Sequence, residues 1–313
     1  MSDKNNTIMA WSILIIALFA VSSAGTILQS MSEIPPFLRA SWRMQGTSLI
    51  LLPFFIFQYI KINTLSINKN DIQLLLLSSI FLALHFGLWM WSLDNTSLVH
   101  SLLFVTMHPI IVVALMPILG SSANKGHIFG ATLGVLGAMI TLADVNKIGD
   151  VSLMGDIAAF GGALTVVGYI FIGRHLRYEK NMPVFIYAFP VTLGAGIWLC
   201  IATIFFESTS FETSIPELNV FGWFDSIWLI WIAYLSLGPG LMGHTGINTI
   251  LKWLPPIMVS SVLLLEPVIG AFIGWLFTGE LILGMWTLIG GPLMIIGVLI
   301  ITLEEKTSST DDF

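Results

Sequence analysis

The chain has 313 residues, of which 56% are hydrophobic and 10% are charged, and its mean hydropathy is +0.91. Soluble globular domains carry about 25% charged residues, so this composition excludes a water-soluble protein and predicts one surrounded by lipid. The net charge of −6 argues against a nucleic-acid partner, because a phosphate backbone requires a basic face. Cys200 is the only cysteine, which excludes an intrachain disulfide.

Taken in chain order, the apolar segments predict ten transmembrane helices. A helix needs about 20 apolar residues to cross a hydrocarbon core of about 30 Å. The expected helices cover residues 9–29, 37–60, 72–93, 98–119, 127–142, 154–173, 184–206, 227–251, 257–277 and 282–303. The predicted fold class is therefore an all-α integral membrane protein that crosses the bilayer many times.

The charges of the loops predict the orientation of these helices, because cytoplasmic loops are enriched in Lys and Arg. With the N-terminus in the cytoplasm, the cytoplasmic side holds Lys4, Lys61, Lys69, Lys125, Arg174, Arg177, Lys180, Lys252 and Lys306. The opposite loops hold only Lys147. We therefore expect both termini in the cytoplasm, with the cell (inner) membrane as the location.

The second half of the sequence repeats features of the first half. At an offset of 158 residues the fourth span falls on the ninth, and at an offset of 160 residues the fifth falls on the tenth. The matched pairs are His108-Pro109 with Glu266-Pro267, Gly130 with Gly290, and Gly137 with Gly297. Five spans per repeat is an odd number, so the second repeat enters the membrane from the opposite side. The sequence thus predicts two inverted five-helix repeats, residues 1–146 and 147–313.

Several motifs in this order point to a known family. Pro36 precedes the second helix and Arg43 follows it by seven residues. The fourth span runs from Ser101-Leu102-Leu103 to Pro109, the sixth ends in Gly173-Arg174-His175-Leu176-Arg177, and the ninth contains Leu263-Leu264-Leu265-Glu266-Pro267 and closes with Gly279-Glu280. From its first span to its last, the chain resembles the EamA family of the drug/metabolite transporter superfamily. The resemblance implies ten helices, cytoplasmic termini, a central cavity, and export or exchange of metabolites by alternating access.

Two ionisable residues stand directly before mid-span prolines. A charge at the bilayer centre costs about 2.5–3.5 kcal/mol, and Glu266 lies about 15 Å along its span at about 1.5 Å per residue. Its carboxyl would carry a proton or pair with a solute amine, or else cap the helix break made by Pro267. Its repeat mate His108 would share a proton with Glu266 or bracket a zwitterionic solute with it. The alternative is a neutral imidazole bonded to a carbonyl freed by Pro109.

Further polar residues share helix faces at i,i+4 spacing or lie within spans. They would line a cavity, or bond one helix to another. These candidates are His85 and Trp89 on the third span, His244 and Asn248 on the eighth, Tyr169 on the sixth and Tyr187 on the seventh.

Two arginines begin the second span near its outer end, one turn apart: Arg39 and Arg43. For Arg43 the position favours a structural salt bridge or a lipid headgroup contact over attraction of an anionic solute. In the fifth span, Gly130 and Gly134 form a small-xxx-small pattern. This pattern predicts close helix packing, either within the bundle or at a dimer face, and leaves the oligomeric state open.

No enzyme signature, cofactor motif or metal-ligand spacing occurs in the sequence. We therefore expect a protein that is not an enzyme, with no cofactor, whose partners are a small-molecule solute and the lipid bilayer. The sequence favours a secondary transporter of small organic metabolites, amino acids being the first class considered, with proton coupling as an option. The alternatives are an uncoupled channel-like facilitator on the same scaffold, an intramembrane enzyme, and, less favoured, a scaffold protein.

Overall fold

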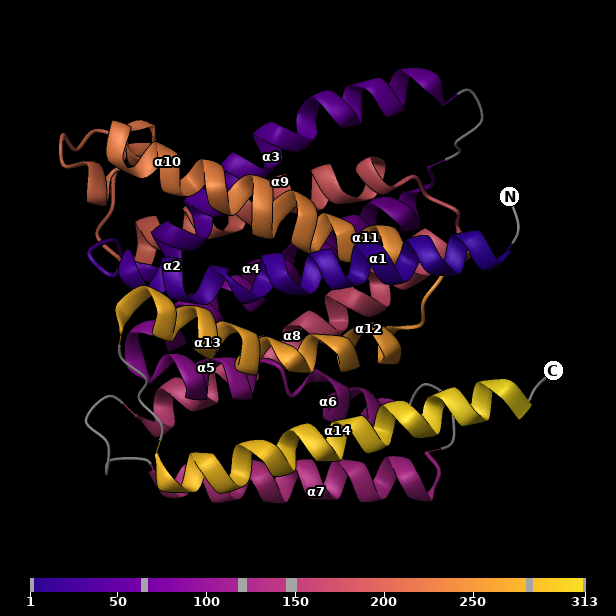
Figure 1. The fold of residues 1–313 in the computed structure, drawn as a ribbon. Helices are drawn as coiled ribbons and strands as arrows, with labels where there is room; N and C mark the ends of the chain where they lie inside the picture. Colours follow the sequence, from indigo (N-terminus) through magenta and orange to yellow (C-terminus); the bar gives the residue numbers. More distant parts are fainter. Residues whose placement is uncertain (1–2, 63–66, 118–122, 145–150, 280–283, 312–313) are drawn as a thin grey trace.

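The structure is a computed structural model, and it describes residues 3–62, 67–117, 123–144, 151–279 and 284–311 (Figure 1). Over these residues the chain is helical, which confirms the predicted fold class. The first half contains α1 (Asp3–Ser22), α2 (Ala24–Ser30), α3 (Pro36–Lys61), α4 (Lys69–Asn95), α5 (Leu98–Val105), α6 (His108–Leu115) and α7 (Lys125–Thr141). The second half contains α8 (Leu153–Arg174), α9 (Val184–Phe206), α10 (Ser226–Leu235), α11 (Gly246–Ile250), α12 (Pro256–Val262), α13 (Glu266–Thr278) and α14 (Met285–Asp311). Short 3-10 and π-helical turns connect some of them, including η1 (Leu142–Asp144), η5 (Ser236–Thr245) and η6 (Leu263–Leu265).

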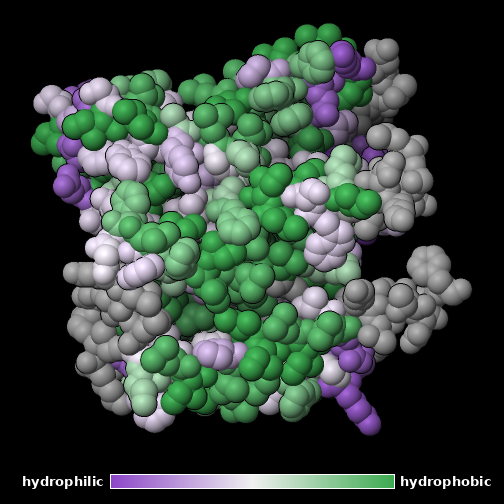
Figure 2. All heavy atoms as spheres, viewed as in Figure 1, coloured by the Kyte–Doolittle hydropathy of each residue, from purple (hydrophilic) through white to green (hydrophobic). Residues whose placement is uncertain are grey.

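The long helices run side by side along one direction, and the two chain termini lie at the same end of the bundle (Figure 1). We call this end the terminal end, and the opposite one the far end. Figure 2 shows that hydrophobic residues dominate the middle of the visible face, while hydrophilic residues gather toward its two ends. This distribution is the one expected where lipid surrounds the middle of a helical bundle.

Nine helical segments in the described part of the chain are long and apolar enough to cross a membrane. They correspond to nine of the ten predicted spans, although residues 118–119 and 282–283 of two predicted spans lie outside the described residues. The one predicted span that is not among these nine is the second in chain order, which forms α3 and has 26 residues. It is less apolar because it carries five polar residues that the bundle buries, namely Arg39, Ser41, Arg43, Thr47 and Ser48.

The fourth and ninth spans are both broken at the predicted prolines. In the first half, α5 ends at Val105 and α6 starts at His108. In the second half, α12 ends at Val262, η6 follows, and α13 starts at Glu266. Proline lacks an N–H and cannot continue the preceding helix. The two breaks therefore occupy equivalent places in the two halves.

The last helix of each half, α7 and α14, pack against each other along their length at one side of the bundle (Figure 1). Glycines make this contact possible, because a Cβ built on Gly130 would lie 2.4 Å from the Gly297 carbonyl oxygen, and one on Gly137 would lie 2.6 Å from that of Gly290. The predicted small-residue contact of the fifth span thus forms within the bundle.

A buried polar network ties helices together near the far end. His100 Nδ1 lies 3.0 Å from Asp156 Oδ2, and its Nε2 lies 2.9 Å from Thr287 Oγ1. The hydroxyl of Thr287 donates to Asp144 at 2.8 Å, and that of Thr96 donates to Asp156 at 2.8 Å. The network joins α5 and α8 to η1 and α14, and so links the two halves.

Candidate functional site

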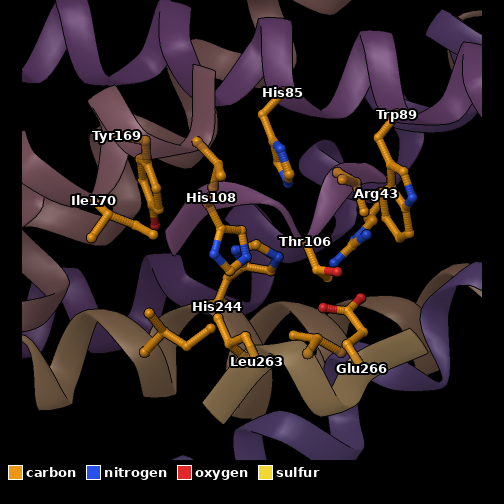
Figure 3. Close-up of a pocket in the computed structure, with 14 residues that line it drawn as sticks. Arg43, His85, Trp89, Thr106, His108, Tyr169, Ile170, His244, Leu263 and Glu266 are labelled. Carbon is orange, nitrogen blue, oxygen red and sulfur yellow. The ribbon is translucent and has the colours of Figure 1, made fainter. Parts of the chain in front are cut away.

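A cavity with a free volume of about 40 Å³ lies at the centre of the bundle, beside the two helix breaks (Figure 3). Its polar lining comes from α3, α4, α8 and η5 and from the residues at the two breaks. Seven of the residues singled out in the sequence line it: Arg43, His85, Trp89, His108, Tyr169, His244 and Glu266. The free volume holds about two waters, so the cavity is contracted in this conformation.

Arg43 is the most deeply buried charged group of this cavity, with 0% of its surface exposed. Its guanidinium carbon lies 4.3 Å from the centroid of the Phe86 ring and 5.9 Å from that of Trp89. None of its three guanidinium nitrogens has a hydrogen-bond partner in the described part of the chain. The salt bridge expected for Arg43 is therefore not seen among the described residues.

Arg39 forms an ion pair instead. One turn before Arg43 on α3, it pairs with Asp94 at the end of α4 and also donates to the carbonyl of Leu28. The sequence placed both arginines near the outer end of the same span and did not distinguish their roles. Their difference arises because α4 and α2 present acceptors to Arg39, whereas Arg43 faces the aromatic rings of α4.

Three histidines gather at the cavity. The rings of His85 and His244 lie 6.2 Å apart, and His85 Nδ1 donates to the Gly162 carbonyl at 2.9 Å. His108 lines the same cavity, and its Nδ1 has no hydrogen-bond partner among the described residues. The expected bond of its imidazole to a freed carbonyl is thus not seen for that nitrogen.

Glu266 points into the cavity from the start of α13, with its carboxylate on the side of Arg43 and Thr106 (Figure 3). Within the described residues no hydrogen bond or ion pair joins Glu266 to His108, and none supports the alternative in which its carboxyl caps the helix break. The cavity thus holds a cation and a carboxylate, contributed by α3 and α13, without a direct bond between them.

Two predicted residues lie outside the cavity wall. Asn248 is bonded to Tyr169, whose hydroxyl donates to Asn248 Oδ1 at 2.9 Å. Tyr187 lies behind Tyr169, with ring centroids 6.2 Å apart, and its hydroxyl is 2.7 Å from that of Ser78. His244 and Asn248 straddle the end of the π-helical segment η5, where i→i+5 bonding changes the angular spacing of side chains. His244 lines the cavity, whereas Asn248 is connected to it through its bond to Tyr169.

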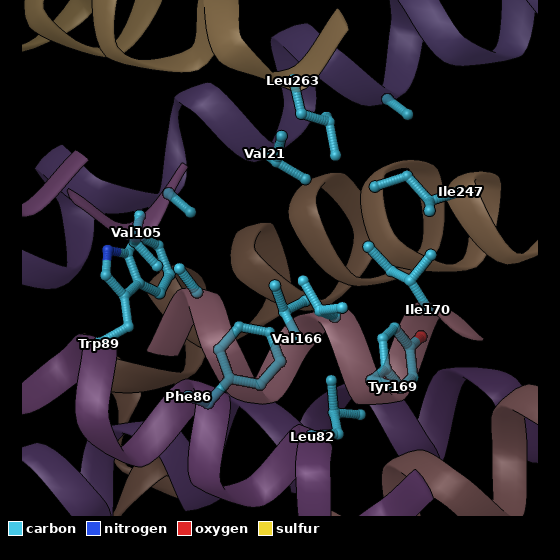
Figure 4. Close-up of a cluster of buried hydrophobic side chains, with 14 of the residues drawn as sticks. Val21, Leu82, Phe86, Trp89, Val105, Val166, Tyr169, Ile170, Ile247 and Leu263 are labelled. Carbon is cyan, nitrogen blue, oxygen red and sulfur yellow. The ribbon is translucent and has the colours of Figure 1, made fainter. Parts of the chain in front are cut away.

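Apolar side chains from both halves close the rest of the cavity (Figure 4). Sequence reasoning missed these lining residues, because an apolar residue in a membrane span gives no signal that separates a cavity wall from a lipid-facing surface. They include Val21, Val105, Val166, Ile170, Ile247 and Leu263. Thr106, two residues before His108, is a polar lining residue that its position at the break could have indicated. Glu280, the acid of the motif that closes the ninth span, lies outside the described residues.

Two segments of the chain, residues 8–143 and 153–303, match the model of the EamA-like transporter family. The chain belongs to this family. As an EamA family member it is a multi-pass membrane protein that transports small solutes, and it is not an enzyme.

Comparison with solved structures finds a chain of similar fold. A structure described only as "Crystal structure of protein" is 16% identical in sequence, with a TM-score of 0.64. The match covers 96% of this chain and 98% of the other. At this identity the similarity concerns the fold alone. No curated protein matches the chain.

Proposed function

We propose that this EamA family member is a secondary transporter that exports or exchanges small organic metabolites by alternating access. Amino acids are the first class to test. The position of the cavity carries the proposal, because polar residues of both repeats meet between the halves at the two helix breaks. Inverted-repeat transporters bind their solutes at such an interface, where discontinuous helices leave backbone groups free.

The two breaks supply the places where the halves would bend. At Pro109 and Pro267 a new helical segment begins, so rotation there disturbs few backbone hydrogen bonds. A metabolite needs far more than about 40 Å³ of free volume. Binding therefore requires the two halves to separate around the cavity, as alternating access demands.

Coupling to protons is the second part of the proposal. Glu266 is a carboxyl group within a membrane span, 9% exposed, next to a cavity that opens and closes. Its proton would be exchanged with one side of the membrane in each open state, while His108 and His244 contact the solute. Glu266 would then link the proton gradient to solute movement.

The test is counterflow of radiolabelled amino acids and related metabolites in proteoliposomes, with and without a pH gradient. Saturable counterflow is expected for at least one solute, since a carrier exchanges solute through a single alternating site. In Glu266→Gln we expect at least a tenfold loss of stimulation by the pH gradient. Glu179→Gln is the matched control, because the Glu179 side chain is 60% exposed, and it should behave as wild type.

Three results would contradict the proposal. Flux without counterflow would favour the channel-like facilitator. If a pH gradient still stimulates transport by Glu266→Gln, Glu266 has no role in proton coupling. Folded protein that moves none of the solutes would contradict transport of this solute class.

A further inference from the structure

Arg43 carries a buried positive charge whose N–H groups find no acceptor in the described part of the chain. Its side chain is 0% exposed, and its Nε, Nη1 and Nη2 all lack hydrogen-bond partners within the described residues. A buried ion without a partner is strongly unfavourable. Such a group persists where something outside the chain completes its environment in another state of the protein.

The neighbouring arginine shows that this fold can satisfy a guanidinium where the need is structural. Arg39 lies on the same helix and is equally buried, and its two terminal nitrogens are taken up by Asp94 and by the carbonyl of Leu28. Arg43 has the rings of Phe86 and Trp89 beside it and shares its cavity with Glu266, yet none of its nitrogens is hydrogen-bonded within the described residues. Rings stabilise the face of a guanidinium but leave the N–H groups at its edge unused.

The edge of a guanidinium matches a carboxylate, which accepts two parallel N–H···O bonds from it. In Figure 3 the guanidinium end of Arg43 is directed into the cavity, toward the region of Thr106 and Glu266. A bound carboxylate would therefore lie inside the cavity, with its remaining atoms among the apolar side chains and histidines that form the wall.

Glu266 limits the charge of the solute. It places one negative charge in the same cavity as the single positive charge of Arg43. A dianion such as inorganic phosphate would meet repulsion from Glu266 and would have no second arginine to offset it. A group with one negative charge, particularly one with a positive charge a few atoms away, complements both residues.

We propose that Arg43 is the binding site for the carboxylate of the transported solute, with Glu266 opposite it selecting against dianions. This assignment rests on the proposed function, because it gives the solute of the same cavity a chemical class. Arg43 would then contact the solute directly, which a purely structural residue does not do.

Binding to purified protein in detergent tests this assignment without transport. The probes are L-alanine, L-leucine, L-phenylalanine and L-lysine, each with its carboxamide, together with acetate, propionate, butyrate and inorganic phosphate. Sodium chloride balances the ionic strength, and the readout is the thermal unfolding midpoint. For at least one carboxylate we expect a saturable rise in the midpoint. Its carboxamide should need at least a tenfold higher concentration, and phosphate should give no rise.

Arg43→Gln should weaken binding of that carboxylate at least 30-fold and make acid and amide bind alike. Its unliganded midpoint should stay at or above that of the wild type, because the guanidinium has no hydrogen bond to lose among the described residues. Arg43→Lys keeps the charge but loses the two-pronged geometry, so it should bind the acid at least tenfold more weakly than the wild type. Arg39→Gln is the control, and it should lower the unfolding midpoint because it breaks an ion pair.

The proposal is overturned if no carboxylate raises the wild-type midpoint, if Arg43→Gln still prefers acid over amide, or if Arg43→Gln is less stable than the wild type. Transport separates it from the proposed function. Carboxylate binding through Arg43 without counterflow would refute the transport proposal alone. Counterflow that treats acids and their amides equally would refute the role of Arg43 and leave transport standing.

Discussion

At the scale of single residues, side chains of the same type differ in whether their polar atoms are hydrogen-bonded. Arg39 and Arg43 are one turn apart, yet among the described residues Arg39 has an ion pair and Arg43 has no hydrogen-bond partner. Among the histidines, His100 bonds through both ring nitrogens, while His108 lines the cavity with Nδ1 unsatisfied. Fully bonded polar groups stabilise a bundle, whereas unsatisfied ones inside a cavity are available to a solute.

His100 is therefore predicted to be a stability residue. His100→Ala leaves Asp156 and Thr287 each without one buried partner, which should cost about 2–4 kcal/mol and lower the thermal unfolding midpoint by several degrees. His175→Ala is the control, since the His175 side chain is 38% exposed and pairs with the exposed carboxylate of Glu179. Thermal unfolding of both variants in the same detergent measures the difference. Equal midpoints would show that the network contributes little.

At the scale of helices, the broken spans line the cavity, and the unbroken helices α7 and α14 pack against each other. The residues at the breaks between α5 and α6 and between α12 and α13 line the cavity, whereas no residue of α7 or α14 does so among the described residues. Instead, α7 and α14 approach each other closely at their glycines. We interpret this pair as a fixed support at one side of the bundle, against which the cavity-lining helices move.

Two neighbouring glycines of α14 provide a matched test of that support. A Cβ on Gly290 would lie 2.3 Å from the Gly137 carbonyl oxygen, whereas one on Gly291 would meet nothing closer than Leu103 at 3.7 Å. Gly290→Ala should therefore destabilise the protein by about 1–3 kcal/mol through overpacking. Gly291→Ala should be neutral or stabilising by up to about 1 kcal/mol, because alanine favours the helix. Unfolding midpoints compare the two, and a tolerated Gly290→Ala would show that the helices can separate freely.

The sequence predicted the spans and the breaks well, and individual bonds poorly. Hydropathy sets the spans because only an apolar helix crosses lipid without cost, and the offset of 158 residues placed the break at Glu266 opposite that at His108. Polar residues within spans largely turned out to line one cavity. Sequence gives depth along a helix but not the neighbour on the next helix, so it did not identify His100 as part of a network or Arg39 as the paired arginine. The π-helical segment η5 also left no recognisable pattern in the sequence.

At the scale of the whole molecule, the two repeats meet at the cavity and at the far-end network. Both termini lie at the terminal end, where α3 ends at Lys61, α4 begins at Lys69 and α7 begins at Lys125 (Figure 1). The long connection between α9 and α10 lies at the far end. Because basic loops stay in the cytoplasm, this arrangement leads us to expect the terminal end inside the cell.

Fusions in a bacterial host test the orientation. Green fluorescent protein at the C-terminus should fluoresce, because it folds in the cytoplasm. Alkaline phosphatase inserted after Glu212, an exposed residue of the far-end connection, should be active because it requires the oxidising exterior. The same enzyme at the C-terminus should be inactive. The reverse pattern would invert the bundle and contradict the orientation.

The pairing of α7 with α14 also bears on how the chain is made. Helix α7 ends at Thr141 and its partner begins only at Met285. At a synthesis rate of about 5–20 residues per second, α7 is in place for about 7–30 seconds before synthesis of α14 begins. During that interval the glycine face of α7 contacts lipid or another helix in place of α14. A chain cut short before the last span would keep that face exposed, and quality-control proteases that survey the membrane would find it there.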